Sequence, residues 1–132
     1  MWNQIKSEVT KINVPFDCGN SPKREFIKEF NIAFAEGNAD FIIEHVSDDI
    51  VWTMYGDKKI EGKEAFSKEI HNLKEKVADK MTLNSIITHG KEAAANGEVN
   101  MDDKTYAFCD VYVFTNNTDR IIEKIDYYVI SI

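Results

Sequence analysis

The sequence predicts one α+β domain, with three helices packed on one face of a curved antiparallel sheet. Helical apolar patterns dominate the first half of the chain, with one strand among them, and strand patterns fill the second half. The strands of the second half are long and joined by short turns, which is typical of an antiparallel meander. With 132 residues, the chain can bury one hydrophobic core without disulfides or metal ions.

The first 20 residues are predicted to be an extension that precedes a single domain spanning 21–132. Apolar side chains at near-helical spacing indicate a short amphipathic helix over residues 2–11. Pro15 and Gly19 then punctuate the chain, which indicates a connector that leads into the domain.

Two helices are predicted to open the domain. Ser21 is a favourable N-cap, Pro22 suits the first helical position, and Gly37 ends the helix. Asn38 can cap a second, shorter helix. The apolar stripe of the first helix contains Phe26, Ile27, Phe30, Ala33 and Phe34, and that of the second contains Phe41, Ile42 and Val46.

A strand, a short segment and a third helix follow. The strand is predicted from Ile50 to Tyr55, where a Gly-Asp turn ends it. Residues 58–61 separate this turn from a third helix, whose apolar stripe contains Phe66, Ile70, Leu73 and Val77. The four strands of the meander are predicted over residues 81–89, 92–101, 104–114 and 120–130.

The strand over residues 104–114 differs from an ordinary surface strand because it is apolar on both faces. Alternation places Tyr106, Phe108, Asp110, Tyr112 and Phe114 on one face, and Thr105, Ala107, Cys109, Val111 and Val113 on the other. Both faces are therefore expected to be covered. A carboxylate among aromatic side chains is desolvated, which raises its pKa, so Asp110 is the leading candidate for chemistry.

Composition and charge exclude several classes of protein. The formal net charge is −7, which argues against nucleic acid or an anionic membrane as a partner, because both require a basic face. No apolar run is long enough to span a membrane, and the N-terminus is too polar for a signal peptide. Two cysteines without a spacing motif indicate reduced thiols. These features predict a cytoplasmic protein.

No motif for a metal or cofactor is present. His45, His71 and His89 fall on different predicted elements and lack the spacing of metal ligands. Gly-rich phosphate loops and the usual nucleophile motifs are also absent from the sequence. We therefore expect neither a metal site nor a cofactor.

Three segments resemble a known family. They are AEGN (35–38), SDDIVWTMYGD (47–57) and IEGKEAF (60–66), followed by the four predicted strands. Over residues 21–131 the chain resembles the SnoaL-like branch of the nuclear transport factor 2-like superfamily, which includes polyketide cyclases and ketosteroid isomerases. The resemblance implies a conical half-barrel with a deep apolar pocket between the helices and the sheet.

The resemblance carries over only part of the catalytic machinery of ketosteroid isomerases. Those enzymes combine a first-strand Asp base, a Tyr donor from the first helix and a protonated Asp on the penultimate strand. The matching positions here hold Met54, Phe30 and Asp110. Asp110 is thus retained, and the ketosteroid isomerase mechanism is not expected.

Several further residues are expected to bind a ligand. Trp52 and Met54 would face the pocket by family analogy, although core packing explains them equally well. Alternation places Asp126 and Tyr128 on one face of the last strand. If this face turns toward the pocket, Asp126 adds a second carboxylate near Asp110. If it turns toward solvent, both residues belong to a solvated stripe. The other candidates for the pocket are Phe30, Phe34, Phe108 and Tyr112.

The sequence also predicts a homodimer, because the strand over 104–114 is apolar on both faces and small residues fill the strand before it. The expected contacts are Cys109, Val111 and Val113 with Ala93 and Ala95. The predicted function is binding of a small apolar, carbonyl-bearing molecule, with Asp110 as acid or electrophile. The alternatives are a non-catalytic binding module and a dimeric interaction protein.

Overall fold

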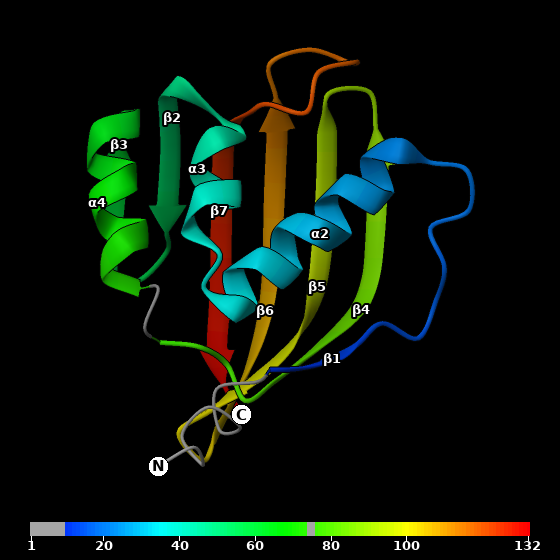
Figure 1. Ribbon diagram of the computed structural model, residues 1–132, viewed down its shortest axis with the longest axis vertical. Coiled ribbons are helices and arrows are strands. Elements are labelled where there is room, and N and C mark those ends of the chain that lie inside the picture. The colour runs from blue at the N-terminus through cyan, green and yellow to red at the C-terminus, as the bar shows by residue number, and fades with distance from the viewer. Residues whose placement is uncertain (1–9, 74–75) are drawn as a thin grey trace.

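The computed structural model describes residues 10–73 and 76–132. It confirms the α+β class: three helices lie on one side of a curved, mostly antiparallel sheet of seven strands in the order β1-β4-β5-β6-β7-β2-β3 (Figure 1). The strands are β1 (Lys11–Asn13), β2 (Val46–Met54), β3 (Lys58–Glu61), β4 (Lys80–His89), β5 (Glu92–Met101), β6 (Lys104–Phe114) and β7 (Ile122–Ser131).

The N-terminal segment differs from the expected connector. Residues 1–9, and with them most of the helix expected over 2–11, lie outside the described residues. Lys11, at the end of that expected helix, instead begins β1, which runs parallel to β4 at the edge of the sheet. Backbone pairing to β4 thus adds a strand that periodicity did not indicate.

The first two helices begin where their capping residues predict. Helix α2 (Pro22–Glu36) is capped by Ser21, whose side chain accepts a hydrogen bond from the Arg24 amide, and Gly37 ends it in the left-handed conformation. Helix α3 (Ala39–Glu44) is capped by Asn38. It stops before Val46 because Val46 begins β2, which pairs in parallel with β7.

The predicted extent of the third helix is wrong. Helix α4 (Lys63–Leu73) does not reach Val77, which lies in an irregular segment before β4. Next to Val77, the backbone amide of Ala78 donates to the carbonyl oxygen of Ala35 on α2, and the Ala78 side chain is buried. This tertiary contact directs the chain toward the sheet.

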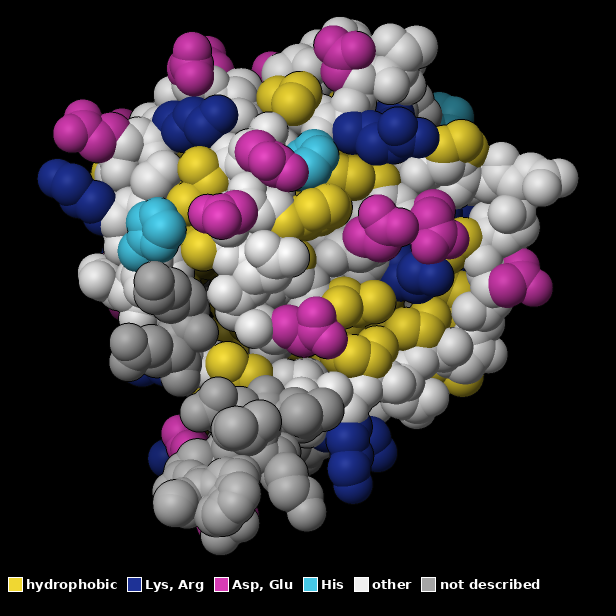
Figure 2. Space-filling model, in the orientation of Figure 1, with side chains coloured by type: hydrophobic (Ala, Val, Ile, Leu, Met, Phe, Trp, Pro, Cys, Tyr) yellow, Lys and Arg dark blue, Asp and Glu magenta, His cyan; other side chains and the backbone are white. Residues whose placement is uncertain are grey.

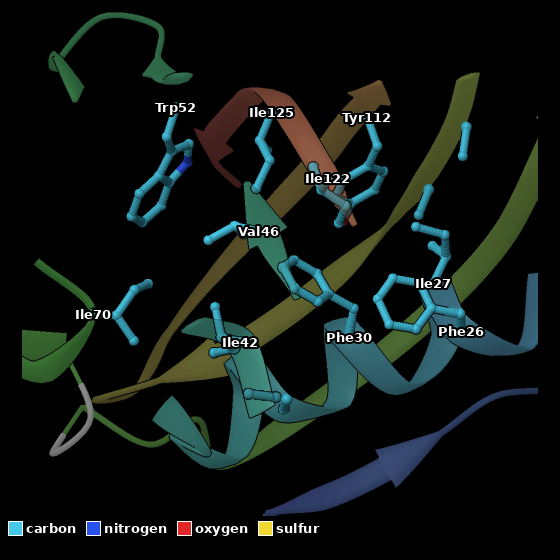
Figure 3. Packing of buried hydrophobic residues seen from close by; sticks show 14 of the residues in the cluster. Phe26, Ile27, Phe30, Ile42, Val46, Trp52, Ile70, Tyr112, Ile122 and Ile125 are labelled. Atoms are coloured by element: carbon cyan, nitrogen blue, oxygen red, sulfur yellow. The ribbon is translucent and has the colours of Figure 1, made fainter. Parts of the chain in front are cut away.

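The hydrophobic core fills the space between the helices and the inner face of the sheet. Phe26 and Phe30 of α2, Ile42 of α3 and Trp52 of β2 converge there (Figure 3). On the helix side of the molecular surface, acidic, basic and apolar side chains are mixed (Figure 2). No helix among the described residues is long and apolar enough to cross a membrane.

The inner face of β5 is built from small residues. Ala93 pairs with Tyr112, Ala95 with Asp110, and Gly97 with Phe108, so each small residue lies beside an aromatic or acidic residue of β6. A Cβ atom at Gly97 would overlap the carbonyl oxygen of Thr82 on β4, so this position requires glycine. Ala93 and Ala95 are therefore core residues, and their expected place in a dimer interface is wrong.

An irregularity in β7 decides which of its side chains face inward. Phe114 of β6 pairs with Ile122, whereas the neighbouring Val113 pairs with Lys124, so Glu123 is an extra residue on β7. Such a bulge shifts the alternation by one position. As a result Ile122 and Ile125 are both buried, a spacing of three that simple alternation does not allow.

Candidate functional site

A pocket of about 310 Å³ lies between the helices and the inner face of the sheet. Its lining is mainly apolar and aromatic, as in most small-molecule sites. Lys76 is exposed and lies at the mouth, whereas Asp110 and Tyr112 are buried. The lining residues are Asn31, Phe34, Ala35, Trp52, Met54, Leu73, Lys76, Ala78, Met81, Val99, Met101, Phe108, Asp110, Tyr112, Ile125 and Tyr127.

Asp110 is the buried acid of this pocket. It lies in the middle of β6, opposite Ala95 on one neighbouring strand and Tyr127 on the other, and only 8% of it is exposed. Burial raises the pKa of its carboxyl group to about 7, and a hydrogen bond from Tyr112 partly opposes this rise. Near neutral pH, both the neutral and the charged form are therefore populated.

A chain of hydrogen bonds leads from α2 to Asp110. The side-chain amide nitrogen of Asn31 donates to the carbonyl oxygen of Ile27 at 2.9 Å and to the hydroxyl oxygen of Tyr112 at 3.0 Å. The Tyr112 hydroxyl in turn donates to Oδ2 of Asp110 at 2.8 Å. Because a carbonyl oxygen can only accept, the Ile27 contact fixes the orientation of the Asn31 amide.

The fixed orientation of the Asn31 amide determines the direction of each hydrogen bond between Asn31 and Asp110. With Asn31 as donor, the Tyr112 hydroxyl must direct its own hydrogen elsewhere, and Oδ2 of Asp110 receives it. Oδ2 is therefore committed as an acceptor, and a proton bound to Asp110 sits on Oδ1. Oδ1 is buried and has no hydrogen-bond partner among the described residues. It is the atom of this site that gains most from a polar partner.

Tyr127 is a second hydroxyl group in the pocket. It lies opposite Asp110 on β7 and lines the cavity. The pKa of its phenol is raised, first by burial and then by the nearby Asp110 charge. The Tyr127 hydroxyl therefore stays protonated and available as a hydrogen-bond donor.

Most of the residues expected in the pocket lie there. Phe34, Trp52, Met54, Phe108 and Tyr112 line the cavity together with Asp110. Phe30 does not line it: its side chain is fully buried in the core, with its ring edge-to-face against Tyr112 at a centroid distance of 6.0 Å. Phe30 supports the wall of the pocket from behind.

Asp126 and Tyr128 lie on the opposite face of the sheet from the pocket. Asp126 pairs with Val111 and Tyr128 with Cys109, both on the outer face of β6. Tyr128 also stacks on Tyr55, with the ring centroids 4.6 Å apart. The inward alternative for these two residues is wrong because the bulge at Glu123 turns Ile125 and Tyr127 inward instead.

Sequence reasoning missed two polar residues of the site. Tyr127 could not be found without the bulge, for which the sequence has no recognisable signal. Asn31 did have a signal, because it is a polar residue one turn after Ile27 in the apolar stripe of α2. Within residues 10–73 and 76–132, no three His, Cys, Asp or Glu side chains gather in a way that could hold a metal ion.

Comparisons with known proteins agree with the fold. The model of the SnoaL-like domain matches residues 27–124. A nuclear transport factor 2-like protein of unknown function from Cytophaga hutchinsonii is 16% identical, with a TM-score of 0.66 over 86% of this chain and 95% of that chain. Comparison with curated protein sequences finds no match.

Two further solved structures share the fold. A protein from Shewanella denitrificans, provisionally named a SnoaL-like polyketide cyclase, is 12% identical, with a TM-score of 0.70 over 83% of this chain and 92% of that chain. A provisionally named ketosteroid isomerase from Kribbella flavida is 11% identical, with a TM-score of 0.67 over 82% of this chain and 77% of that chain. At these identities the likeness concerns the fold alone.

Proposed function

The chain belongs to the SnoaL-like domain family of the nuclear transport factor 2-like superfamily, and from this premise we propose that its pocket binds a small apolar molecule that bears a carbonyl group. The carbonyl group of the ligand and the carbon next to it lie beside Asp110, which exchanges a proton with the ligand. The observation that carries the proposal is the buried Asp110 carboxyl, with one oxygen held by Tyr112 and the other free of any described partner.

The lining of the pocket supports an apolar ligand. Trp52, Met54, Phe108 and Ile125 surround Asp110 with carbon and ring surface. Burial of apolar ligand surface against such a wall contributes about 25 cal/mol per Å². The cavity volume of about 310 Å³ fits a molecule of one or two rings.

The state of Asp110 supports a carbonyl or enol group on that ligand. A neutral Asp110 carries its proton on Oδ1 and can donate it to a carbonyl oxygen. A charged Asp110 offers the same atom as an acceptor to an enol. With a pKa of about 7, the side chain is suited to both roles at neutral pH.

The chemistry that follows is a proton shift next to the carbonyl group. The Asp110 carboxylate takes a proton from the carbon beside the carbonyl, which breaks that C–H bond and leaves an enolate. The neutral Asp110 then returns the proton to the same carbon or to another one. The reaction consumes no co-reactant, because the carboxyl ends in the form in which it began.

A non-catalytic binding module is the second candidate, and Met54 favours it. Met54 lines the pocket wall, at the position that the family resemblance matches to the base of ketosteroid isomerases, and a thioether cannot remove a proton. Asp110 is the one carboxyl group among the described residues that line the pocket. If Asp110 does not move protons, the same pocket binds its ligand without turnover.

Ketone binding and hydrogen exchange together test the proposal. We would screen a panel of alicyclic and aryl ketones, with 2-tetralone as the first probe, by thermal denaturation. The proposal expects saturable stabilisation of the wild-type protein that is lost in Asp110→Asn. In deuterated water, NMR should show faster loss of the hydrogens beside the carbonyl group with wild type than with Asp110→Asn.

The matched control is Asp126→Asn, on the outer face of the neighbouring strand. It makes the same chemical change and should leave both stabilisation and exchange as in the wild type. Binding without accelerated exchange would identify the binding module. Equal exchange by wild type and Asp110→Asn would remove Asp110 from the chemistry.

A further inference from the structure

The polar side chains that line the pocket gather at its two ends. At the inner end, Oδ1 of Asp110 has no hydrogen-bond partner among the described residues, and Tyr127 lies beside it on the neighbouring strand. At the mouth lies the exposed Lys76. The wall between the two ends is carbon and ring surface, from residues such as Met81 and Phe108. A ligand that uses the whole pocket therefore has a polar group at each of its ends.

The two ends are far enough apart for a ligand with two separate polar groups. Residues 76–79 lead into β4 at the lower end of the sheet (Figure 1). The backbone amide of Asp79 donates to the carbonyl oxygen of Asn100, which pairs with Thr105 at the start of β6. Asp110 lies five residues farther along β6, which corresponds to about 17 Å. This spacing leaves room for two fused rings between Asp110 and a lysine side chain at the mouth.

The charge at the mouth favours an anionic group on the ligand. Lys76 is the one cationic residue among the described residues that line the pocket, and it forms no ion pair with the described residues. Its ammonium group can donate three hydrogen bonds, and the apolar wall beside it strengthens the attraction to an anion. The formal net charge of the chain is −7, which repels a phosphate dianion more than a carboxylate. A carboxylate therefore suits this single lysine best.

The charge of Asp110 decides which way such a ligand lies. A carboxylate beside Asp110 would place two like charges in a desolvated site, which disfavours the charged form of both. With its carboxylate at Lys76, the ligand avoids this repulsion. Its carbonyl group then lies at the inner end of the pocket, where Asp110 and Tyr127 line the wall.

We propose that the pocket binds an apolar keto acid, with the carboxylate paired to Lys76 at the mouth and the carbonyl group beside Asp110. This inference rests on the proposed function and adds to it the anionic group and the orientation of the ligand. The alternative role of Lys76 is to cover the apolar mouth with its aliphatic stem while the ammonium group stays in water. A substitution that removes the charge and keeps the stem separates the two roles.

A pair of probes that differ only in charge tests the proposal. The probes are 2-tetralone with a carboxyl group at ring position 6 and the methyl ester of that acid, and calorimetry measures their binding to the full chain. The wild type should bind the acid about tenfold more tightly than the ester, as expected for a hydrogen bond to a charged group. Lys76→Met should bind both probes equally, whereas Lys76→Arg keeps the charge and should keep the preference.

Two further variants locate the two ends of the ligand. Lys68→Met makes the same change at an exposed position of α4 outside the pocket, and it should keep the wild-type preference for the acid. Asp110→Asn should weaken binding of the acid and the ester by the same factor, because its contact lies at the other end of the ligand.

The outcomes separate this inference from the proposed function. Equal affinities of acid and ester in the wild type would overturn the carboxylate and leave the ketone pocket in place. A preference for the acid that persists in Lys76→Met would remove Lys76 from the site. Tighter binding of the acid by Asp110→Asn than by the wild type would contradict the orientation. Binding of neither probe would overturn the inference and the proposed function together.

Discussion

Tyr112 donates its hydroxyl hydrogen to Oδ2 of Asp110 across 2.8 Å, although the two residues are only two positions apart on β6. Both side chains leave the same face of the strand, so they are neighbours in the pocket wall. The bond favours the charged carboxylate, whereas burial favours the neutral acid, and burial is the larger effect. The pocket therefore holds a carboxyl group that is balanced between its two forms.

Tyr112→Phe should raise the pKa of Asp110 further above about 7. The substitution removes the hydrogen bond that stabilises the carboxylate and leaves the desolvation in place. A carbon-13 NMR titration of the Asp110 carboxyl group measures the shift. Tyr106→Phe, which removes a hydroxyl farther along the same strand, is the control. An unchanged or lower pKa in Tyr112→Phe would contradict the described hydrogen bond.

Asp110→Asn should change how stability depends on pH. The pKa of Asp110 is about 3.9 in an unfolded chain and rises to about 7 in the folded protein. The folded protein thus binds this proton more tightly than the unfolded chain. The contribution of Asp110 to the free energy of unfolding is therefore highest below pH 4, falls as the pH rises to about 7, and is constant above.

The size of this effect is on the order of 4 kcal/mol, from about three pKa units. Denaturant titrations between pH 4 and 8 would measure the free energy of unfolding of wild type and Asp110→Asn. As the pH rises, this free energy should fall for the wild type relative to the variant. Asp48→Asn, at an exposed position, reports the effect of changing the net charge by the same amount. A difference that stays flat across this range would show that Asp110 is not desolvated.

Gly97→Ala should destabilise the fold by about 2 kcal/mol, as overpacking typically does. The added methyl group would overlap the Thr82 carbonyl oxygen and crowd the ring of Phe108. Chemical denaturation measures the loss. Full stability of Gly97→Ala would show that β4 and β5 can separate at this point without cost.

Ser21→Ala should lower the free energy of unfolding by about 1 kcal/mol, because it removes the N-cap of α2. Ser21→Asp keeps an acceptor for the Arg24 amide and should restore most of the stability. If all three proteins unfold at the same denaturant concentration, the cap contributes nothing.

The elements with local signals could be predicted from the sequence. The caps at Ser21, Gly37 and Asn38 set the limits of α2 and the start of α3, because they satisfy backbone groups within a few residues. The inward face of β6 followed from its alternation, and with it the placement of Asp110 in a buried wall. These features depend on neighbours in the chain.

The features that depend on distant contacts could not be predicted. Ala78 bonds to α2 before the chain enters β4, and β2 extends to Val46 through its pairing with β7. Tyr127 and not Asp126 faces the pocket, because the pairing between β6 and β7 contains a bulge at Glu123. Tyr112, the hydrogen-bond partner of Asp110, lies on the same strand, but Asn31 and Tyr127 come from α2 and β7, so no single stretch of sequence contains the site.

The extra residue in β7 has a consequence for chain length. On either side of Glu123, the register with β6 is regular: Ile122 pairs with Phe114 and Lys124 with Val113. A chain that lacks Glu123 could therefore keep both pairings and both buried isoleucines while β7 became a straight strand. Position 123 is thus a place where this fold tolerates the loss of a residue. In the shortened sequence, simple alternation would predict the inner and outer faces of β7 correctly.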